Sequence, residues 1–199
     1  MKRITGHLFL FIVVILFFSF EAMANEVNKK MNKDEHVIYN FEKADAIEYW
    51  RIVNDGVMGG LSQSKIISSN HGTAIFKGKV SLENYGGFAS TRTIPFSYNL
   101  GGYKGVRLRV KGDGKKYQFR LRTDNSFDGV SYRYEFRTEA DTWIVINVPF
   151  HECTSVFRGR ILKETEPINP EEIQQIGFLI SDKQAGKFQI EIDWIKAYK

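Results

Sequence analysis

The strongest constraint on the fold is a period-two alternation of apolar and polar side chains that recurs along the chain. Its clearest runs are 106–111, 117–122, 130–137 and 188–194. Such alternation is typical of strands that bury one face and expose the other. Further strands are expected at 36–42, 61–69, 73–82, 87–93, 142–149 and 176–181. Many short strands separated by turn residues predict an all-β protein, a jelly-roll β-sandwich.

Helix signals are sparse. Residues 44–49 are long enough for one or two turns, and 169–172 combine an asparagine cap with proline and two acids. That combination favours a short helix start. No internal repeat and no second domain are visible, so we expect a single domain over 36–199.

The first residues have the pattern of a secretory signal peptide. A basic start at Lys2 and Arg3 precedes an apolar run from Leu8 to Phe20, and Ala22 and Ala24 stand before the expected cut. We therefore expect a signal peptide over 1–24, a flexible polar lead-in over 25–35, and export, to the periplasm. An uncleaved membrane anchor is the alternative. No transmembrane segment is expected after cleavage.

Charge and cysteine content exclude several classes of function. The formal net charge is +5, and removing residues 1–24 takes away two bases and one acid, leaving +4. A balance this mildly basic does not indicate a nucleic-acid partner. With one cysteine, Cys153, the chain has no internal disulfide, so packing must stabilise it.

The stretch WRIVNDGVMGGLS, at 50–62, looks at first like a phosphate-binding loop. A P-loop, however, continues with Lys and then Ser or Thr after its last glycine, and Leu61 and Ser62 follow here. A dinucleotide fingerprint needs a helix at this point, where the pattern predicts a strand. We therefore expect a tight structural turn over 54–60, with Gly59 or Gly60 at positive φ.

Two other motifs resemble functional sites in their letters alone. Residues 124–135 approximate a calcium loop, but both flanks alternate as strands, which favours a hairpin loop. Whether Asp124 and Asp128 hold a calcium ion outside such a loop stays an open question. The triplet His151-Glu152-Cys153 lacks a further partner for nucleophilic catalysis. We expect no catalytic residue, no metal and no cofactor.

Arginines are the most informative polar residues. The alternation places six of them on the solvent side of three successive strands, and successive strands usually pair, so a shared face is expected. Guanidinium groups recognise carboxylates and related anions in a bidentate manner. Either an acidic partner, protein or polysaccharide, binds this face, or the arginines pair with acids of the same surface. The six candidate residues are Arg107, Arg109, Arg120, Arg122, Arg133 and Arg137.

Over roughly 36–198 the chain resembles the complex I intermediate-associated protein 30 family. The matching segments are 50–62, 86–92, 105–114, 117–124, 157–160 and 176–195. The resemblance implies a galactose-binding-domain-like jelly roll and a non-enzymatic protein that assists assembly of respiratory complex I. The resemblance also implies a structural family motif, which consists of Trp50, Asn54, Asp55, Gly56, Met58, Gly59, Gly60, Phe157, Arg158 and Gly159.

The function therefore has two candidate classes. The first is a binding or assembly factor that docks onto another protein, which a flat exposed apolar patch would favour. The second is an exported module for a carbohydrate or an anionic ligand, which aromatics in a groove beside the arginines would favour.

Overall fold

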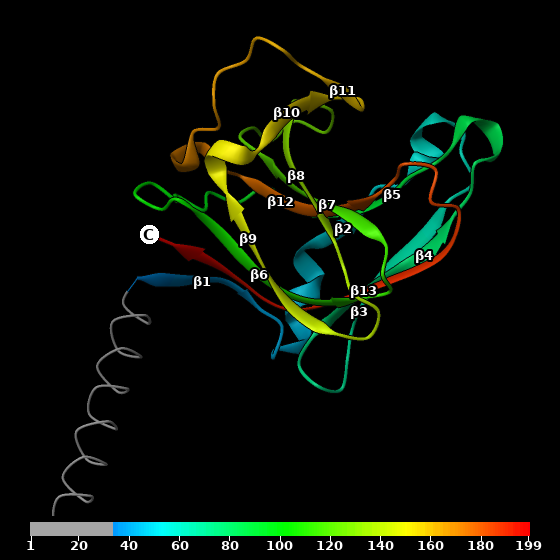
Figure 1. Cartoon of the computed structure of the whole chain (residues 1–199), viewed down its shortest axis with the longest axis horizontal. Helices are drawn as coiled ribbons and strands as arrows, with labels where there is room; N and C mark the ends of the chain where they lie inside the picture. The colour runs from blue at the N-terminus through cyan, green and yellow to red at the C-terminus, as the bar shows by residue number, and fades with distance from the viewer. Residues whose placement is uncertain (1–33) are drawn as a thin grey trace, which may run out of the picture. The chain divides into compact units, whose positions relative to one another are not determined.

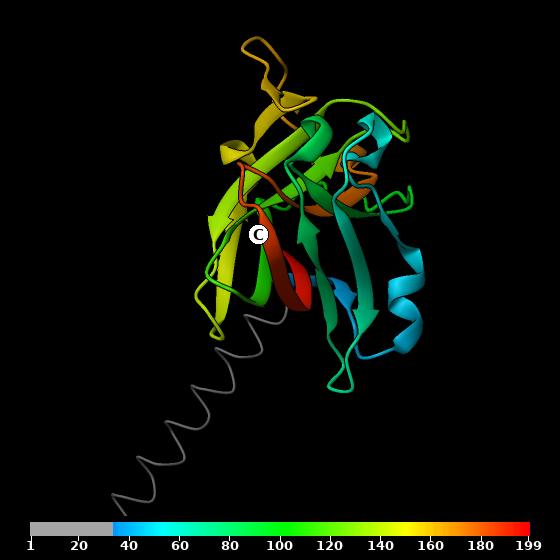
Figure 2. The ribbon, with the colours of Figure 1, turned by 90° about the vertical axis from the view of Figure 1, so that its right-hand side faces the viewer.

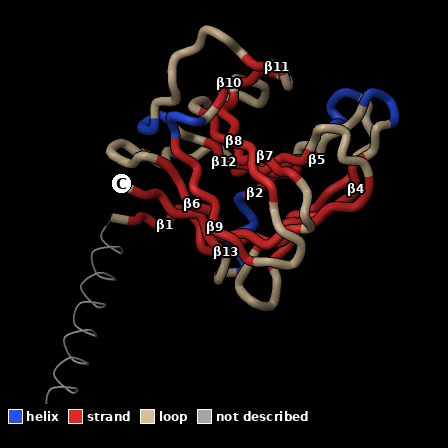
Figure 3. The backbone as a smooth tube through the Cα atoms, in the orientation of Figure 1, coloured by secondary structure: helices blue, strands red, loops and turns tan. Residues whose placement is uncertain are grey.

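The computed structural model describes residues 34–199, and its strands form two sheets (Figures 1 and 3). The predicted signal peptide, 1–24, and nearly all of the lead-in, 25–35, lie outside these residues. The unit Val37–Lys199 contains both sheets apart from the first two residues of the first strand. No helix within 34–199 is long and apolar enough to span a membrane.

The first sheet has six strands. Along its path they are β3 (Gln63–Ser68), β4 (Ala74–Val80), β13 (Gly186–Tyr198), β6 (Gly105–Gly112) and β9 (Trp143–Pro149), and β1 (Glu35–Asn40) also pairs with β13. The turn at 69–72 joins β3 to β4 and forms the tip of a long hairpin (Figure 2).

The second sheet has seven strands. Their order is β11 (Arg160–Ile161), β10 (Thr154–Phe157), β8 (Ser131–Arg137), β7 (Lys116–Arg122), β12 (Gln175–Ile180), β5 (Ala89–Thr93) and β2 (Trp50–Ile52). The ladders that link β2 through β13 are antiparallel. The predicted all-β sandwich is confirmed.

The helical segments are short 3-10 turns. They are η1 (Ala44–Tyr49), η2 (Asp55–Met58), η3 (Glu83–Tyr85), η4 (Phe150–Glu152) and η5 (Pro170–Glu172). Two of them, η1 and η5, lie where the sequence predicts helix. In η5 the side chain of Asn169 accepts a hydrogen bond from the Glu171 amide, as its capping role requires.

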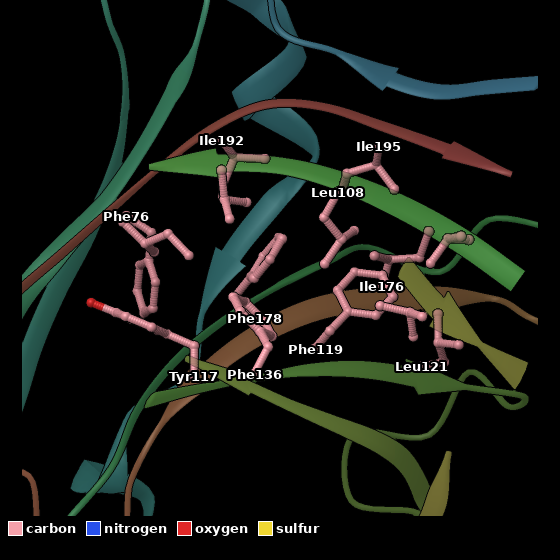
Figure 4. Close-up of a cluster of buried hydrophobic side chains, with 14 of the residues drawn as sticks. Phe76, Leu108, Tyr117, Phe119, Leu121, Phe136, Ile176, Phe178, Ile192 and Ile195 are labelled. Atoms are coloured by element: carbon pink, nitrogen blue, oxygen red, sulfur yellow. The ribbon is translucent and has the colours of Figure 1, made fainter. Parts of the chain in front are cut away.

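The core lies between the sheets and is built from the inward half of each alternating strand (Figure 4). Tyr117, Phe119 and Leu121 of β7 are fully buried, and Leu108 of β6 faces them from the other sheet. Along β13 the alternation keeps its phase only as far as Ile192. A β-bulge between Ile192 and Trp194 then shifts the register, so that Ile195 is buried in place of Trp194.

The connection from β6 to β7 carries the chain from one sheet to the other. It runs through a turn at 112–114, where the Thr138 side chain packs so closely that a Cβ atom on Gly112 would lie 2.4 Å from Thr138 Oγ1. Two strands that follow one another here do not pair. Because of this crossing, the arginines of β6 lie on a different sheet from those of β7 and β8.

Candidate functional site: an arginine-floored groove

The outward face of the seven-stranded sheet holds a groove of about 570 Å³. Its floor comes from β8, β7, β12 and β5. Its rim comes from the 53–58 corner, the 127–129 loop and the turn at Arg158 and Gly159. The strands supply their non-core residues to the floor: in β7, for example, Gln118, Arg120 and Arg122 alternate with the buried core positions.

Strand register places three arginines in one row across the floor. Arg92 of β5 lies opposite Gly177 of β12, Gly177 lies opposite Arg120 of β7, and Arg120 lies opposite Arg133 of β8. Arg122 follows two residues after Arg120 on the same face. Gly177 brings no side chain to the middle of the row, and β5 packs so closely against it that a Cβ atom there would lie 2.6 Å from the Thr91 carbonyl oxygen.

Arg120 is the half-buried centre of this cluster, and its hydrogen bonds all go to uncharged acceptors. Its Nε and Nη2 atoms donate to Gln118 Oε1 at 3.1 and 2.7 Å, and Nη1 donates to Ser131 Oγ at 3.4 Å. Burial, followed by the charges of Arg122 and Arg133, lowers the pKa of Arg120 to about 10. The charges of Glu135 and Asp182 act in the opposite direction but do not cancel this shift.

Among residues 34–199, the other arginines of the floor find acceptors for only part of their N–H groups. Arg122 donates to the Gly129 carbonyl at 2.7 Å, and Arg92 donates to the Phe127 carbonyl at 2.7 Å while its guanidinium lies 4.9 Å from the centre of the Phe127 ring. Arg133 has an acidic neighbour, Glu135, at 3.3 Å. Burial lowers the pKa of both Arg92 and Arg122.

The six arginines predicted from sequence do not share one face. Arg120, Arg122 and Arg133 line the groove, whereas Arg107 and Arg109 belong to β6 in the other sheet. The expectation of a shared face is wrong because the 112–114 turn changes sheets instead of forming a hairpin. Arg137 is exposed on β8, donates to the Gly114 carbonyl at 3.0 Å and is not among the groove-lining residues.

On the outer face of the six-stranded sheet, basic side chains pair with acids of the same surface, as the alternative interpretation of the arginines expected. Arg109 pairs with Asp193, and Lys111 pairs with Glu191 at 2.8 Å. Arg107 donates to Asn147 Oδ1 at 3.0 Å and lies over the Tyr198 ring.

Two groove arginines were missed as candidate ligands. Arg92 lies in the predicted strand 87–93, where Ser90 and Arg92 alternate with buried Ala89, Thr91 and Thr93, so the period-two signal was available. Arg158 was assigned only to the family motif. Its place beside the groove depends on contacts between distant segments, for which the sequence carries no signal.

The glycine-rich corner is organised around a buried carboxylate. Asp55 is fully buried and accepts hydrogen bonds from the Ser62 amide and hydroxyl at 2.9 and 2.5 Å, and from the amides of Gly87 and Phe88 at 2.7 and 3.2 Å. Burial alone would raise the pKa of Asp55, but these bonds outweigh it and lower the pKa. Gly59 has φ of 88°, so the predicted turn is confirmed.

Neighbouring residues of the motif fix the corner to the sheet. Asn54 Oδ1 accepts from Ser64 Oγ at 2.7 Å and from the Ser90 amide at 3.2 Å. Trp50 is buried and stacks on Phe178 with ring centres 6.0 Å apart. Val57 and Met58, by contrast, are each 60% exposed at the rim of the groove.

The loop over 123–130 joins two antiparallel strands, β7 and β8, so the hairpin interpretation holds. Asp124 Oδ1 accepts from the amide and hydroxyl of Ser126, and Asp128 pairs with Arg158, whose Nε lies 2.9 Å from Asp128 Oδ2. The Phe157-Arg158-Gly159 motif therefore forms a turn that joins this loop at the rim. Within residues 34–199 no group of three potential metal ligands occurs.

Cys153 and His151 do not form a catalytic pair in this geometry. The Cys153 thiol donates to the Pro149 carbonyl at 3.6 Å, while His151 lies 3.8 Å from the Glu152 carboxylate. Burial, and then the charge of Glu152, raises the pKa of Cys153 to about 12. A thiol held in this way is a poor nucleophile at neutral pH.

Known structures share the sandwich. A family 11 carbohydrate-binding module of a cellulosomal cellulase from Clostridium thermocellum superposes with a TM-score of 0.63 at 17% identity, covering 82% of this chain and 94% of the module. An agarase structure gives a TM-score of 0.56 at 8% identity over 83% of this chain and 25% of that one. At these identities the likeness concerns the fold alone.

Several curated relatives share one name. A mouse (Mus musculus) protein, "Complex I intermediate-associated protein 30, mitochondrial", is 28% identical over 182 residues, which cover 81% of this chain and 56% of that protein. The probable counterpart from Caenorhabditis briggsae is 26% identical over 84% of this chain and 55% of its own length. The chain spans about half the length of these relatives.

The names of the relatives also correct one expectation. The worm, mouse and Drosophila melanogaster proteins are all named mitochondrial, which contradicts export to a periplasm and leaves the signal-peptide assignment without support. Basic and apolar residues at an N-terminus are shared by several kinds of segment, and residues 1–33 lie outside the described structure.

A family model described as "Complex I intermediate-associated protein 30 (CIA30)" matches residues 39–192, which is most of the chain. The match contains the corner, the groove and both sheets apart from residues 35–38 of β1 and 193–198 of β13. The chain belongs to the complex I intermediate-associated protein 30 family.

Proposed function

We propose that this chain is a non-catalytic assembly factor that docks onto a protein partner while respiratory complex I is being built. The family and the names of its relatives support the assembly role. An exposed apolar surface beside the groove supports docking. We call this surface the corner patch, and it consists of Val57, Met58, Leu61, Leu82 and Tyr85.

The corner patch consists of apolar side chains that are largely exposed. The exposed fractions of its side chains are 60%, 60%, 50%, 46% and 100% in the order given. Clustered exposed apolar side chains mark interaction sites, whereas scattered ones are normal. Tyr85 also has φ of 60° and Asn84 has φ of 53°, so the backbone that presents the patch is held in a costly conformation.

The two loops that carry the patch are tied together. Asp55 joins the 54–60 corner to the amides of Gly87 and Phe88, and the Ser81 amide donates to Ser62 Oγ at 2.9 Å. The segments η2 and η3 accordingly lie side by side (Figure 3). A preorganised apolar surface loses little conformational entropy on binding, which supports a docking role.

The experiment is complementation in cells that encode this chain. Deleting its gene should lower the amount of assembled complex I on native gels and leave a smaller intermediate. The wild-type chain should restore the complex, whereas the Val57→Ser/Met58→Ser variant should not. The matched control is Val37→Ser/Val145→Ser, which removes side chains that are 50% and 51% exposed but lie outside the patch. Normal complex I in the deletion cells would refute the assembly role.

The second candidate is a module for a carbohydrate or an anionic ligand. A groove of about 570 Å³ is within the size range of ligand sites and supports this candidate. The likeness to carbohydrate-binding modules concerns the fold and brings no ligand to this chain. Unimpaired assembly in deletion cells, combined with a saturable sugar ligand, would favour this candidate.

A further inference from the structure

We propose that the floor of the groove is a carboxylate-binding site, which receives an acidic side chain of the partner protein. This inference rests on the proposed function, and it names the chemistry that the partner must present at one point. The occupant to which we commit is an acidic residue flanked by apolar residues in one polypeptide segment.

The first observation is the uneven balance of charge in the floor. Arg92, Arg120, Arg122 and Arg133 bring four positive charges together on one sheet face. Like charges directly opposite one another on neighbouring strands destabilise a sheet, and Arg120 faces Arg133 in this way. A charge cluster of this kind is offset when an anion binds between its members.

The acids nearest to the cluster offset its charge only in part. The charges of Asp124 and Asp128 act on Arg92 and Arg122. Glu135 is shared between Arg133 and Lys116, whose Nζ lies 2.9 Å from its carboxylate. Asp182 also pairs with Lys116, at 3.1 Å, and Asp128 pairs with Arg158. These acids therefore offset part of the charge of the floor, but within residues 34–199 none of them forms an ion pair with Arg120.

The second observation is the geometry of the donors on Arg120. A guanidinium group has five N–H donors. Three have acceptors: Nε–H and one Nη2–H at Gln118, and one Nη1–H at Ser131. One N–H on each Nη atom therefore has no acceptor among the described residues. Two donors on adjacent nitrogens at the end of a guanidinium match the two oxygens of one carboxylate.

Gln118 and Ser131 also hold the guanidinium in place. Both are almost fully buried, with exposed fractions of 3% and 1%, and both are fixed in strands. The donors are thus oriented before any ligand arrives, which reduces the entropic cost of binding. Gly177 leaves the space above the row free of a side chain.

The surroundings favour a polypeptide as the source of the carboxylate. Val57 and Met58 line the groove and also belong to the corner patch, so the two surfaces are continuous. Phe127, 64% exposed, stands on the rim in contact with Arg92. A segment that places an acidic residue over Arg120 would therefore lay its neighbouring apolar side chains against Met58 and Phe127. Methionine adapts well to such contacts.

The test uses probes of defined chemistry on the full chain. Amide signals of the protein are followed by NMR during titration with acetyl-Leu-Glu-Leu-amide, its glutamine counterpart, glucuronate and inorganic phosphate. The glutamate peptide should shift signals of β5, β7 and β8, and the glutamine peptide should bind about tenfold more weakly or worse, since hydrogen bonds between charged groups are the stronger ones. Added salt should lower the affinity for the glutamate peptide more than the affinity for the glutamine peptide.

Variants locate the site. The double variant Arg120→Gln/Arg133→Gln should lower the affinity for the glutamate peptide about tenfold or more. The control variant Arg107→Gln/Arg109→Gln, on the other sheet, should leave this affinity unchanged. If the double groove variant does not fold, Arg133→Gln alone serves, with folding checked by circular dichroism.

Each outcome separates this inference from the assembly role. Equal binding of the two peptides, or groove variants that bind the glutamate peptide normally, would overturn the carboxylate site, even if the corner-patch variant still fails in complementation. Tighter binding of glucuronate or phosphate than of the peptide would overturn the polypeptide source. If deletion cells assemble complex I normally while the groove still binds the glutamate peptide selectively, the proposed function and the proposed partner are refuted but the carboxylate site is not.

Discussion

A Cβ atom on Gly60 would lie 2.4 Å from Cγ of Asp55, so the carboxylate of the corner occupies the space that any side chain at position 60 would need. Gly86 approaches the same carboxylate from the other loop, with a Cβ position 2.7 Å from Asp55 Oδ2. Gly60 of the family motif and Gly86 thus let two loops close around one buried anion.

The three corner glycines should tolerate alanine to different extents. Gly60→Ala should lower the free energy of unfolding by about 2 kcal/mol or more, because it collides with Asp55. Gly59→Ala should cost about 1 kcal/mol, because φ is 88° but the surrounding space is open. Gly56→Ala, with open space and ordinary φ, is the control and should change stability by less than about 0.5 kcal/mol. Chemical denaturation measures all three, and equal losses would contradict the assignment.

Asp55→Asn should destabilise the fold by about 2–4 kcal/mol, because a neutral amide replaces an acceptor of four hydrogen bonds. The pKa of Asp55 is lowered in the folded state. Its contribution is therefore present above the unfolded pKa, about 4, and is lost as pH falls towards the folded value. Chemical denaturation at a series of pH values should show that the free energy of unfolding of the wild type falls below a pH of about 5. The fall should be smaller in the variant. Identical pH profiles would show that Asp55 is not the titrating group.

Arg120→Gln should leave the fold as stable as the wild type or raise its free energy of unfolding by up to about 1 kcal/mol. The change removes one member of a like-charged pair across neighbouring strands. Residues kept for binding often cost stability in this way. Arg109→Gln is the control, because it breaks a pair with Asp193 and should destabilise slightly. A large loss of stability for Arg120→Gln would mean that this arginine is structural.

Cys153 should react slowly in the native protein at pH 8. Its pKa is raised to about 12, chiefly by burial, so the thiolate is scarce. Labelling with a disulfide reagent should be much faster after unfolding in guanidinium chloride, where the pKa returns to about 8.5. Equal rates in the two states would contradict the buried environment described here.

Period-two alternation was sufficient to predict the sandwich. Residues such as Phe119 and Leu108 lie inside because strand geometry puts every second side chain on one face. The alternation could not reveal the bulge after Ile192, which inserts one residue and leaves composition unchanged. Nor could it indicate which strands pair, since pairing depends on contacts between segments far apart in sequence.

The candidate site was predicted only in part for the same reason. Arg120 and Arg133 were correctly placed together, because β7 and β8 form a hairpin. Arg109 was wrongly added, because the turn at 112–114 crosses between sheets. Arg92 joins the row through β12, which lies more than 50 residues away in sequence and links β5 to β7.

Photo-cross-linking from the corner patch tests the docking proposal most directly. Benzoylphenylalanine replaces Met58 or, as the control, Val145, whose side chain is 51% exposed on the other sheet. Irradiated cells are analysed by mass spectrometry. The account predicts adducts from position 58 to a complex I subunit, within a segment that contains aspartate or glutamate, and far fewer from position 145. Equal adducts from both positions, or none to complex I from position 58 while the variant still restores assembly, would contradict it.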